Sequence, residues 1–181
     1  WYGCGNTSLA NPSTIRIGVK PDGRIGLHQG AVDIGQGSNT VITQIAADAL
    51  GLPIALFDLV SADTDLTPDC GKTSASRQTF VTGKAAELAG RALRQQILRL
   101  ANAGSDAKLA SDGGILVVAD GAERRRIDLG TQNCTHGNGC RDKRGRQLES
   151  HGGSPPPVLH SIVYTIKLSC TRYRSIHFVY T

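Results

Sequence analysis

Apolar and polar residues alternate through the segment Ile15-Arg-Ile-Gly-Val-Lys20. Alternation with a period of two is typical of a half-buried β-strand. Pro21-Asp-Gly23 follows with residue types that form tight turns, and the apolar pattern then resumes over residues 24–32. We therefore predict a β-hairpin over residues 15–32.

A helical period follows the hairpin. Its apolar positions recur three or four residues apart and would share one face of a helix: they are Ile42, Ile45, Ala46 and Ala49. Ser38 or Asn39 can cap the start of this helix, and Gly51-Leu-Pro53 supplies the stop signals. The pattern predicts a helix from Ser38 to Leu50.

The next apolar run, residues 54–61, is short and has turn residues on both sides, so it predicts a buried strand. A loop over residues 62–76 leads to a second, longer helical pattern that Gly104 would end. Its apolar face comprises Ala86, Ala89, Leu93, Ile97 and Leu100. Two further strands are predicted over residues 114–119 and 123–129, joined by a turn at Asp120-Gly121.

Together these elements predict an α+β fold in which a mixed β-sheet packs with two main helices. The pattern ends near residue 130, beyond which only residues 158–168 resemble a strand. We therefore expect one domain over residues 1–129 and an irregular, basic C-terminal tail over residues 130–181, foreign to the body or frame-shifted. The 181-residue sequence contains no Met, so we expect a partial domain, a piece of a larger subunit.

The charge distribution separates the same two regions. The net charge is +5, but residues 1–128 carry 13 basic and 13 acidic residues, so the excess lies in residues 129–181. A non-catalytic binding module whose basic tail contacts nucleic acid is therefore an alternative function. The neutral body makes nucleic acid an unlikely partner.

Cysteine usage and hydropathy bear on the compartment. The five cysteines are odd in number and match no disulfide framework, so reduced thiols in the cytoplasm are expected, with the periplasm as the alternative. No apolar run reaches the length of a membrane span.

Two Gly-, Ser- and Thr-rich loops carry the most distinctive chemistry of the chain. Gly30-Ala-Val-Asp-Ile-Gly-Gln-Gly37 runs into the first helix, and Asp69-Cys-Gly-Lys-Thr-Ser-Ala-Ser-Arg77 runs into the second. Helix starts offer free N–H donors and a partial positive charge. Two such loops that converge could bind one phosphate-bearing cofactor.

Two other kinds of site, a nucleotide-binding P-loop and a zinc site, fit the sequence less well. Gly71-Lys-Thr73 imitates the end of a P-loop, but Leu66 stands where that motif requires glycine. Cys134, His136 and Cys140 suggest zinc, yet their spacing is unusual and no second matched pair follows.

The order and spacing of several short motifs resemble the large, molybdenum-binding subunit of the xanthine dehydrogenase and aldehyde oxidase family. These motifs are Gly30-x-x-Asp-Ile-Gly-Gln-Gly37, Leu50-Gly-x-Pro53, Asp63-Thr-Asp65 and Gly71-x-Thr-Ser-Ala-Ser-Arg77. Trp1-Tyr-Gly-Cys-Gly-Asn6 and Asn11-Pro-Ser-Thr-Ile15 are similar to bacterial members that oxidise aldehydes or N-heterocycles.

The resemblance implies that both loops bind molybdopterin, commonly its cytosine dinucleotide form in bacteria. Glycine lets the backbone approach a ligand closely, the amide of Gln36 can donate and accept, and Arg77 offers a fork of donors to a phosphate. The implied cofactor-binding residues are Ile34, Gly35, Gln36, Gly37, Thr73, Ser74, Ala75, Ser76, Arg77 and Gln78.

The resemblance also implies the reaction, a hydroxylation of aldehydes or N-heterocycles with oxygen drawn from water. Electrons leave through iron–sulfur clusters in a partner subunit or domain. The family's catalytic glutamate motif and its Gly-Gly-Gly-Phe-Gly-Gly type motif do not occur in the sequence. No catalytic or metal-ligating residue is assigned here, and the isolated chain is expected to be inactive without the remainder of the large subunit.

Overall fold

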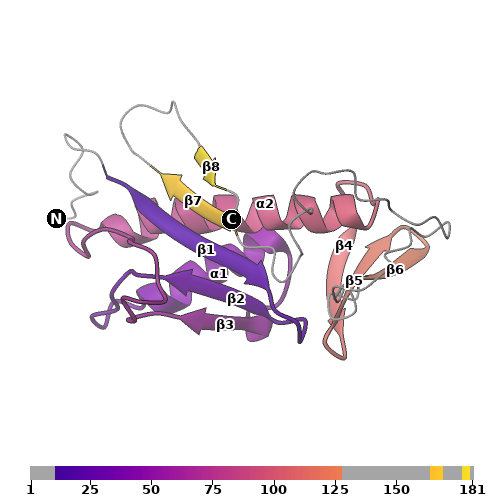
Figure 1. The fold of residues 1–181 in the computed structure, drawn as a ribbon, viewed down its shortest axis with the longest axis horizontal. Helices are drawn as coiled ribbons and strands as arrows, with labels where there is room; N and C mark the ends of the chain where they lie inside the picture. The colour runs from indigo at the N-terminus through magenta and orange to yellow at the C-terminus, as the bar shows by residue number, and fades with distance from the viewer. Residues whose placement is uncertain (1–10, 128–163, 169–176, 180–181) are drawn as a thin grey trace, which may run out of the picture.

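A five-stranded mixed sheet forms the centre of the protein. The computed structural model describes residues 11–127, 164–168 and 177–179. The sheet has the strand order β3-β2-β1-β7-β8, and Figure 1 shows it in front of two helices. Its strands are β1 (Ser13–Val19), β2 (Ile25–Gln29), β3 (Phe57–Val60), β7 (Tyr164–Leu168) and β8 (His177–Val179).

Strand pairing confirms the predicted hairpin and the mixed character of the sheet. β1 and β2 pair antiparallel with Ile17 opposite Leu27, whereas β2 and β3 pair parallel with Leu27 opposite Leu59. Two parallel strands must be joined by a crossover connection. The connection from β2 to β3 contains the helix α1 (Ser38–Leu50). β7 continues the sheet by pairing antiparallel with β1.

Both helices pack on one face of the sheet, as Figure 1 shows. β1 alternates as predicted, with every second residue buried, and its inward side chains meet the apolar faces of α1 and of α2 (Gly83–Leu100). Gly51 ends α1 in the left-handed conformation with φ 80°, as its stop signal predicted. The core therefore lies between one sheet face and two helices.

A smaller antiparallel sheet lies beyond the end of α2 (Figure 1). It comprises β4 (Lys108–Asp112), β5 (Ile115–Asp120) and β6 (Glu123–Ile127). The guanidinium of Arg94 on α2 donates to the carbonyl oxygens of Leu50 at 3.1 Å and Ala107 at 2.6 Å. One side chain thus joins the end of α1 to the chain that enters the small sheet.

Several predicted elements need correction. Residues 54–61 do not form one buried strand: a 3-10 turn occupies Ile54–Leu56, Ile54 is 43% exposed, and the strand covers Phe57–Val60 at the sheet edge. Leu100, predicted on the buried face of α2, is 54% exposed at its end. α2 ends at Leu100 with Ala101 as its C-cap, before Gly104.

Within the predicted tail, the structure describes only β7 and β8. The strand expected over residues 158–168 corresponds in part to β7. Cys4, the Trp1–Asn6 motif, the zinc candidates and the basic run near residue 144 lie outside the described residues. The division into residues 1–129 and 130–181 stays a prediction.

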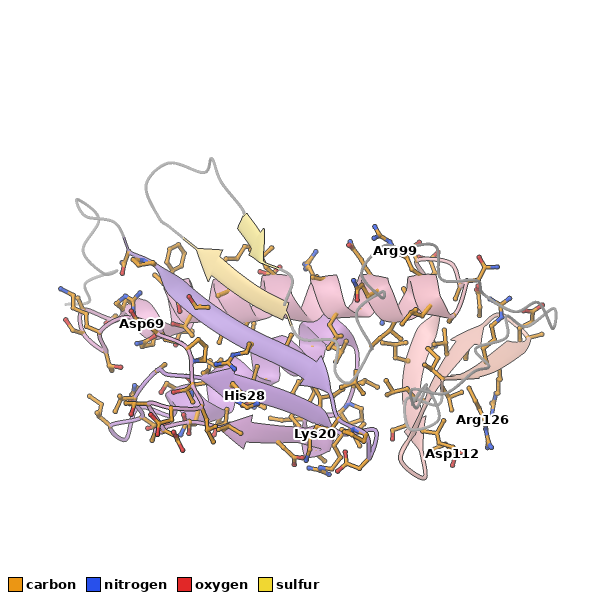
Figure 2. The ribbon with its side chains drawn as sticks, in the orientation of Figure 1. Lys20, His28, Asp69, Arg99, Asp112 and Arg126 are labelled. Atoms are coloured by element: carbon orange, nitrogen blue, oxygen red, sulfur yellow. The ribbon has the colours of Figure 1, made fainter. Side chains whose placement is uncertain are left out.

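The loop between β3 and the second Gly-rich segment crosses the sheet face opposite the two helices (Figure 1). Arg16 and His28 lie on that face, and their side chains donate to the carbonyl oxygen of Leu66 at 3.3 and 3.0 Å. The N–H of Thr14 donates to the carbonyl oxygen of Asp69. Figure 2 shows His28 on the sheet and Asp69 beyond one end of it. The contacts bring residues 69–77 to the end of the sheet where β2 enters the first loop.

Candidate functional site

The two predicted loops lie next to each other. The hydroxyl of Thr73 in the second loop accepts the N–H of Val32 in the first at 3.2 Å and lies 3.3 Å from the Val32 carbonyl oxygen. The N–H of Gly30 donates to the Cys70 sulfur at 3.1 Å. A Cβ at Gly30 would lie 2.4 Å from the carbonyl oxygen of Pro68. Glycine is required there because the two backbones approach so closely.

Asp33 holds the first loop together. Its Oδ1 accepts the N–H groups of Gly35 at 2.9 Å and Gly37 at 3.3 Å, and its Oδ2 accepts that of Asn39 at 3.1 Å. These bonds hold the pKa of Asp33 below its usual range, with the N–H of Asn39 as the largest cause. The N–H groups of Gly35 and Gly37, expected to face a phosphate, instead bind a carboxylate of the same loop.

The helix cap also differs from the prediction. Gly37, not Ser38 or Asn39, is the N-cap of α1, with φ 78° and no side-chain cap of its own. A capping residue normally satisfies free N–H groups at the helix start. Asp33 does this from four residues upstream of the cap.

The amide of Gln36 is folded onto its own loop. Its Oε1 accepts the N–H of Ile34 at 2.6 Å, and its Nε2 donates to the carbonyl oxygen of Val32 at 3.0 Å. Gln36 is nevertheless exposed, and Ile34 is 74% exposed. The outer surface of the loop therefore consists of an amide and an apolar side chain.

Gly35 and Gly37 face open space. Their φ angles are +98° and +78°, and a Cβ built on either meets no atom of the described residues within 4 Å. Positive φ favours glycine, and the lack of neighbours means that a ligand could approach this side of the loop. Gly71 in the second loop differs, since a Cβ there would lie 2.8 Å from a guanidinium nitrogen of Arg77.

Arg77 does not present its donors to a ligand. It is 2% exposed, and its guanidinium donates to Asn11 Oδ1 at 2.5 Å and to the carbonyl oxygens of Cys70 at 2.5 Å, Lys72 at 3.0 Å and Pro12 at 2.8 Å. Burial lowers the pKa of this guanidinium. The fork of donors predicted to bind a phosphate instead holds the second loop against the start of β1.

Gln78 has a similar internal role. It is 4% exposed, and its Nε2 lies 3.1 Å from the Thr73 hydroxyl and 3.2 Å from the Lys72 carbonyl oxygen. Its Oε1 accepts the hydroxyl of Thr82, which lies 2.7 Å from that of Ser13. A chain of buried polar groups thus runs from β1 to the junction of the two loops.

Ala75 and Ser76 form the exposed bend of the second loop. Both have φ +55°, a left-handed conformation that costs a residue with a side chain about 1–2 kcal/mol. A π-helical turn over Gln78–Thr82 follows directly. Strained residues and π-turns are both found often at functional sites. Ser74, Ala75 and Ser76 are exposed, so their backbone is open to a ligand.

Sequence reasoning missed three residues that shape the site. Asp33 lies two and four residues before glycines, a spacing typical of Asp-stabilised turns that could have identified it. Buried Gln29 donates to Asn39 Oδ1 and accepts the N–H of Ala31, each at 2.7 Å. The thiol of Cys70, free and buried, donates to the Thr14 carbonyl oxygen. The last two have no local sequence signal.

No cluster of three or more potential metal ligands occurs in the part of the chain that the structure describes. None of the helices described combines the length and hydropathy that crossing a bilayer requires. A hollow of about 340 Å³ is lined by the C-terminal half of α2 and the residues that follow it, including Arg91 and Arg99, and by no residue of the two loops.

Comparison with known proteins gives a consistent family. A family model described as a molybdopterin cofactor-binding domain matches residues 1–149. The putative xanthine dehydrogenase molybdenum-binding subunit of Escherichia coli K12 is 37% identical over 84 residues, which are 46% of this chain and 11% of that protein. The probable hypoxanthine oxidase of the same strain is 36% identical over 102 residues, which are 54% of this chain and 11% of that protein.

A solved structure has a similar fold. The Cu,Mo-containing CO dehydrogenase in its carbon monoxide reduced state aligns with a TM-score of 0.54 and 20% identity, covering 93% of this chain and 22% of that one. At this identity the likeness concerns the fold alone. The chain spans only a small part of each relative, 11% of the two proteins compared by sequence.

Proposed function

Because this chain belongs to the molybdopterin cofactor-binding domain family, we propose that its two adjoining loops form one wall of a molybdopterin site. The observation that carries the proposal is the contact of Thr73 with Val32, which fastens both loops at one end of the sheet. The proposed wall comprises Ile34, Gly35, Gln36, Gly37, Thr73, Ser74, Ala75, Ser76, Arg77 and Gln78.

These residues fit the cofactor in two different ways. Gly35 and Gly37 leave open space beside the first loop, and Ser74, Ala75 and Ser76 expose the backbone of the second. Both surfaces can meet a ligand directly. Arg77 and Gln78 are buried and act through the protein, because their polar atoms hold the second loop in its strained shape.

The finer features of the proposal follow the family resemblance. The cofactor would be the cytosine dinucleotide form, and the chain would belong to a larger subunit that works with an iron–sulfur subunit or domain, in the cytoplasm or the periplasm. When bound, the molybdenum cofactor would supply the hydroxylation of an aldehyde or N-heterocycle with oxygen from water. The residues of this chain would bind and orient it, and none is assigned a catalytic role.

The nucleic-acid alternative depends on basic residues between 141 and 146, which lie outside the described residues. It stays a prediction.

Two glycine variants test the cofactor site. Gly37→Ala places a methyl group on the open side of the first loop, whereas Gly121→Ala places one in the turn between β5 and β6. Both glycines have positive φ and open space around a Cβ, so both variants should lose about 1 kcal/mol of stability. Only Gly37→Ala should lower the molybdenum and pterin content of the purified parent subunit, by about tenfold.

Comparison of the two variants separates the effect of backbone strain, which both share, from the effect of a methyl group at the proposed cofactor site, which only Gly37→Ala has. Equal cofactor content in Gly37→Ala and Gly121→Ala, at matched stability, would show that the first loop does not face the cofactor. The proposed site would then be wrong. Metal analysis and pterin fluorescence of the purified subunits provide the two measurements.

A further inference from the structure

The carboxylate of Asp33 differs from the other loop aspartates. Asp22, Asp63 and Asp69 each accept backbone N–H groups through one oxygen, from residues two or three positions downstream. Asp33 uses both oxygens and accepts three N–H groups, of which those of Gly37 and Asn39 belong to the start of α1. Asp33 therefore binds a helix terminus as well as its own turn.

The start of a helix attracts an anion. Its first N–H groups lack partners within the helix and carry a partial positive charge. A phosphate or a side-chain carboxylate can satisfy the same donors. In this protein the carboxylate is supplied from inside the loop, and it reaches Asn39 in the first turn of α1 at 3.1 Å.

We infer that Asp33 is a positioning residue: an internal anion that occupies the start of α1, fixes the loop around Gln36 and keeps phosphate groups from these donors. The inference deepens the proposed function and rests on it where the cofactor is concerned. A phosphate-bearing cofactor would then meet the outer side of the loop, where Gln36 and Ile34 are exposed, and not the N–H groups of Gly35 and Gly37.

The orientation of the backbone at Gly35 and Gly37 supports this division of the loop into two sides. The N–H groups of Gly35 and Gly37 point to Asp33, while the Cβ positions of both glycines point to open space. The two glycines are needed because the chain must turn with positive φ around the carboxylate. A change at Asp33 should therefore alter the loop's shape without altering any group that touches the ligand.

Anion rescue of a truncated side chain tests the inference on the full 181-residue chain. Asp33→Ala should lower the thermal unfolding midpoint by about 3–6 °C. Formate or inorganic phosphate should then raise the midpoint of this variant, in comparison with chloride at equal ionic strength, by filling the vacated donors. The wild type and the control Asp48→Ala, an exposed position on α1, should respond to these anions no more than to chloride.

A second variant covers the case in which Asp33→Ala does not fold. Asp33→Asn keeps one acceptor oxygen but loses the charge and one accepting atom, so the amide protons of Gly35, Gly37 and Asn39 should exchange about tenfold faster. Asp48→Asn should leave their exchange unchanged. Exchange is read residue by residue by NMR.

Two results would overturn the inference. One is stabilisation of the wild type by phosphate as strong as that of Asp33→Ala, because the donors would then be open to external anions. The other is unchanged exchange of these amides in Asp33→Asn. Neither measurement involves molybdopterin, so a failure here is distinct from a failure of the Gly37→Ala test.

Discussion

The guanidinium of Arg77 joins the second loop to the chain that precedes β1. It donates to Asn11 and Pro12 before β1, to Cys70 and to Lys72. Planar geometry with five donors lets one arginine satisfy several carbonyl oxygens at once. Buried carbonyl oxygens that lose such a partner cost free energy. The shape of the second loop therefore depends on one side chain that is hidden from any ligand.

Arg77→Ala should lower the free energy of unfolding by about 3–5 kcal/mol, because several buried acceptors lose their donor together. Arg77→Lys should recover only part of this, since a single ammonium group cannot match the fork. The control Arg91→Ala removes an exposed ion pair with Glu87 and should cost less than about 1 kcal/mol. Urea denaturation of the three variants gives these values. A loss for Arg77→Ala no larger than that for Arg91→Ala would contradict the structural role.

At the scale of elements, the packing of the two helices depends on one glycine. A Cβ at Gly90 on α2 would lie 2.8 Å from the carbonyl oxygen of Ala46 and 2.9 Å from the Cβ of Ala49, both on α1. Neither atom can move without the backbone of α1. A Cβ at Gly83 on the same helix would lie 2.8 Å from the Cδ1 of Ile45, the flexible end of a side chain.

Gly90→Ala should therefore destabilise the protein by about 2 kcal/mol through overpacking, although alanine is the better helix former. Gly83→Ala should change stability by less than about 0.5 kcal/mol or raise it slightly. Chemical denaturation of both variants makes the comparison within one helix. If both glycines tolerated alanine equally, the close crossing of α1 and α2 would be wrong.

The elements differ in how well the sequence predicts them, for physical reasons. α1 was predicted at its observed limits because its apolar period and its Gly51 stop signal agree. The apolar run over residues 54–61 predicts a buried strand because composition does not distinguish such a strand from an exposed 3-10 turn followed by a short edge strand. β4 was missed since its sequence Lys-Leu-Ala-Ser-Asp has only one strongly apolar residue, Leu109.

The convergence of the two loops could be predicted from the sequence, but the contacts of their side chains could not. Glycine and serine content identified both loops, and the family resemblance is confirmed by the match over residues 1–149. The partners of Arg77 lie as far away as Asn11, and no local pattern relates such positions. Donors that looked available to a ligand, in Arg77 and at Gly35, are used within the protein. Direct contact of the loop residues with the cofactor stays a prediction.

In the molecule as a whole, a charged cluster lies at the end of the sheet opposite the two loops. Figure 2 shows Lys20 and Asp69 at opposite ends. Lys20 and Arg24, which flank the hairpin turn, each lie 2.6 Å from a carboxylate oxygen of Asp58 on β3. Sequence neighbours supply the cations and the edge strand supplies the anion, so the cluster joins the hairpin to β3.

This cluster should make the protein sensitive to acid. Hydrogen bonds from Arg24, and then from Lys20, hold the pKa of Asp58 well below its usual range, and the pKa values of Asp33 and Glu87 are lowered as well. A carboxyl group whose pKa is lower in the folded state stabilises that state above its unfolded pKa, about 4. The contribution is lost as the pH falls from about 4 towards the folded pKa.

Stability measured by urea unfolding should therefore be nearly constant from pH 7 to about pH 5 and should fall below about pH 4. Asp58→Asn should be less stable than the wild type at pH 7, and its curve should fall less steeply in acid, so that the two approach each other near pH 2. High salt should reduce the difference at pH 7, because both cations are partly exposed and such pairs are screened.

Asp48→Asn serves as the control, since Asp48 has no ion-pair partner among residues 11–127. Its stability curve should run parallel to that of the wild type. Parallel curves for Asp58→Asn as well would mean that the cluster does not couple the hairpin to β3, and the acid sensitivity would then have to come from Asp33 and Glu87.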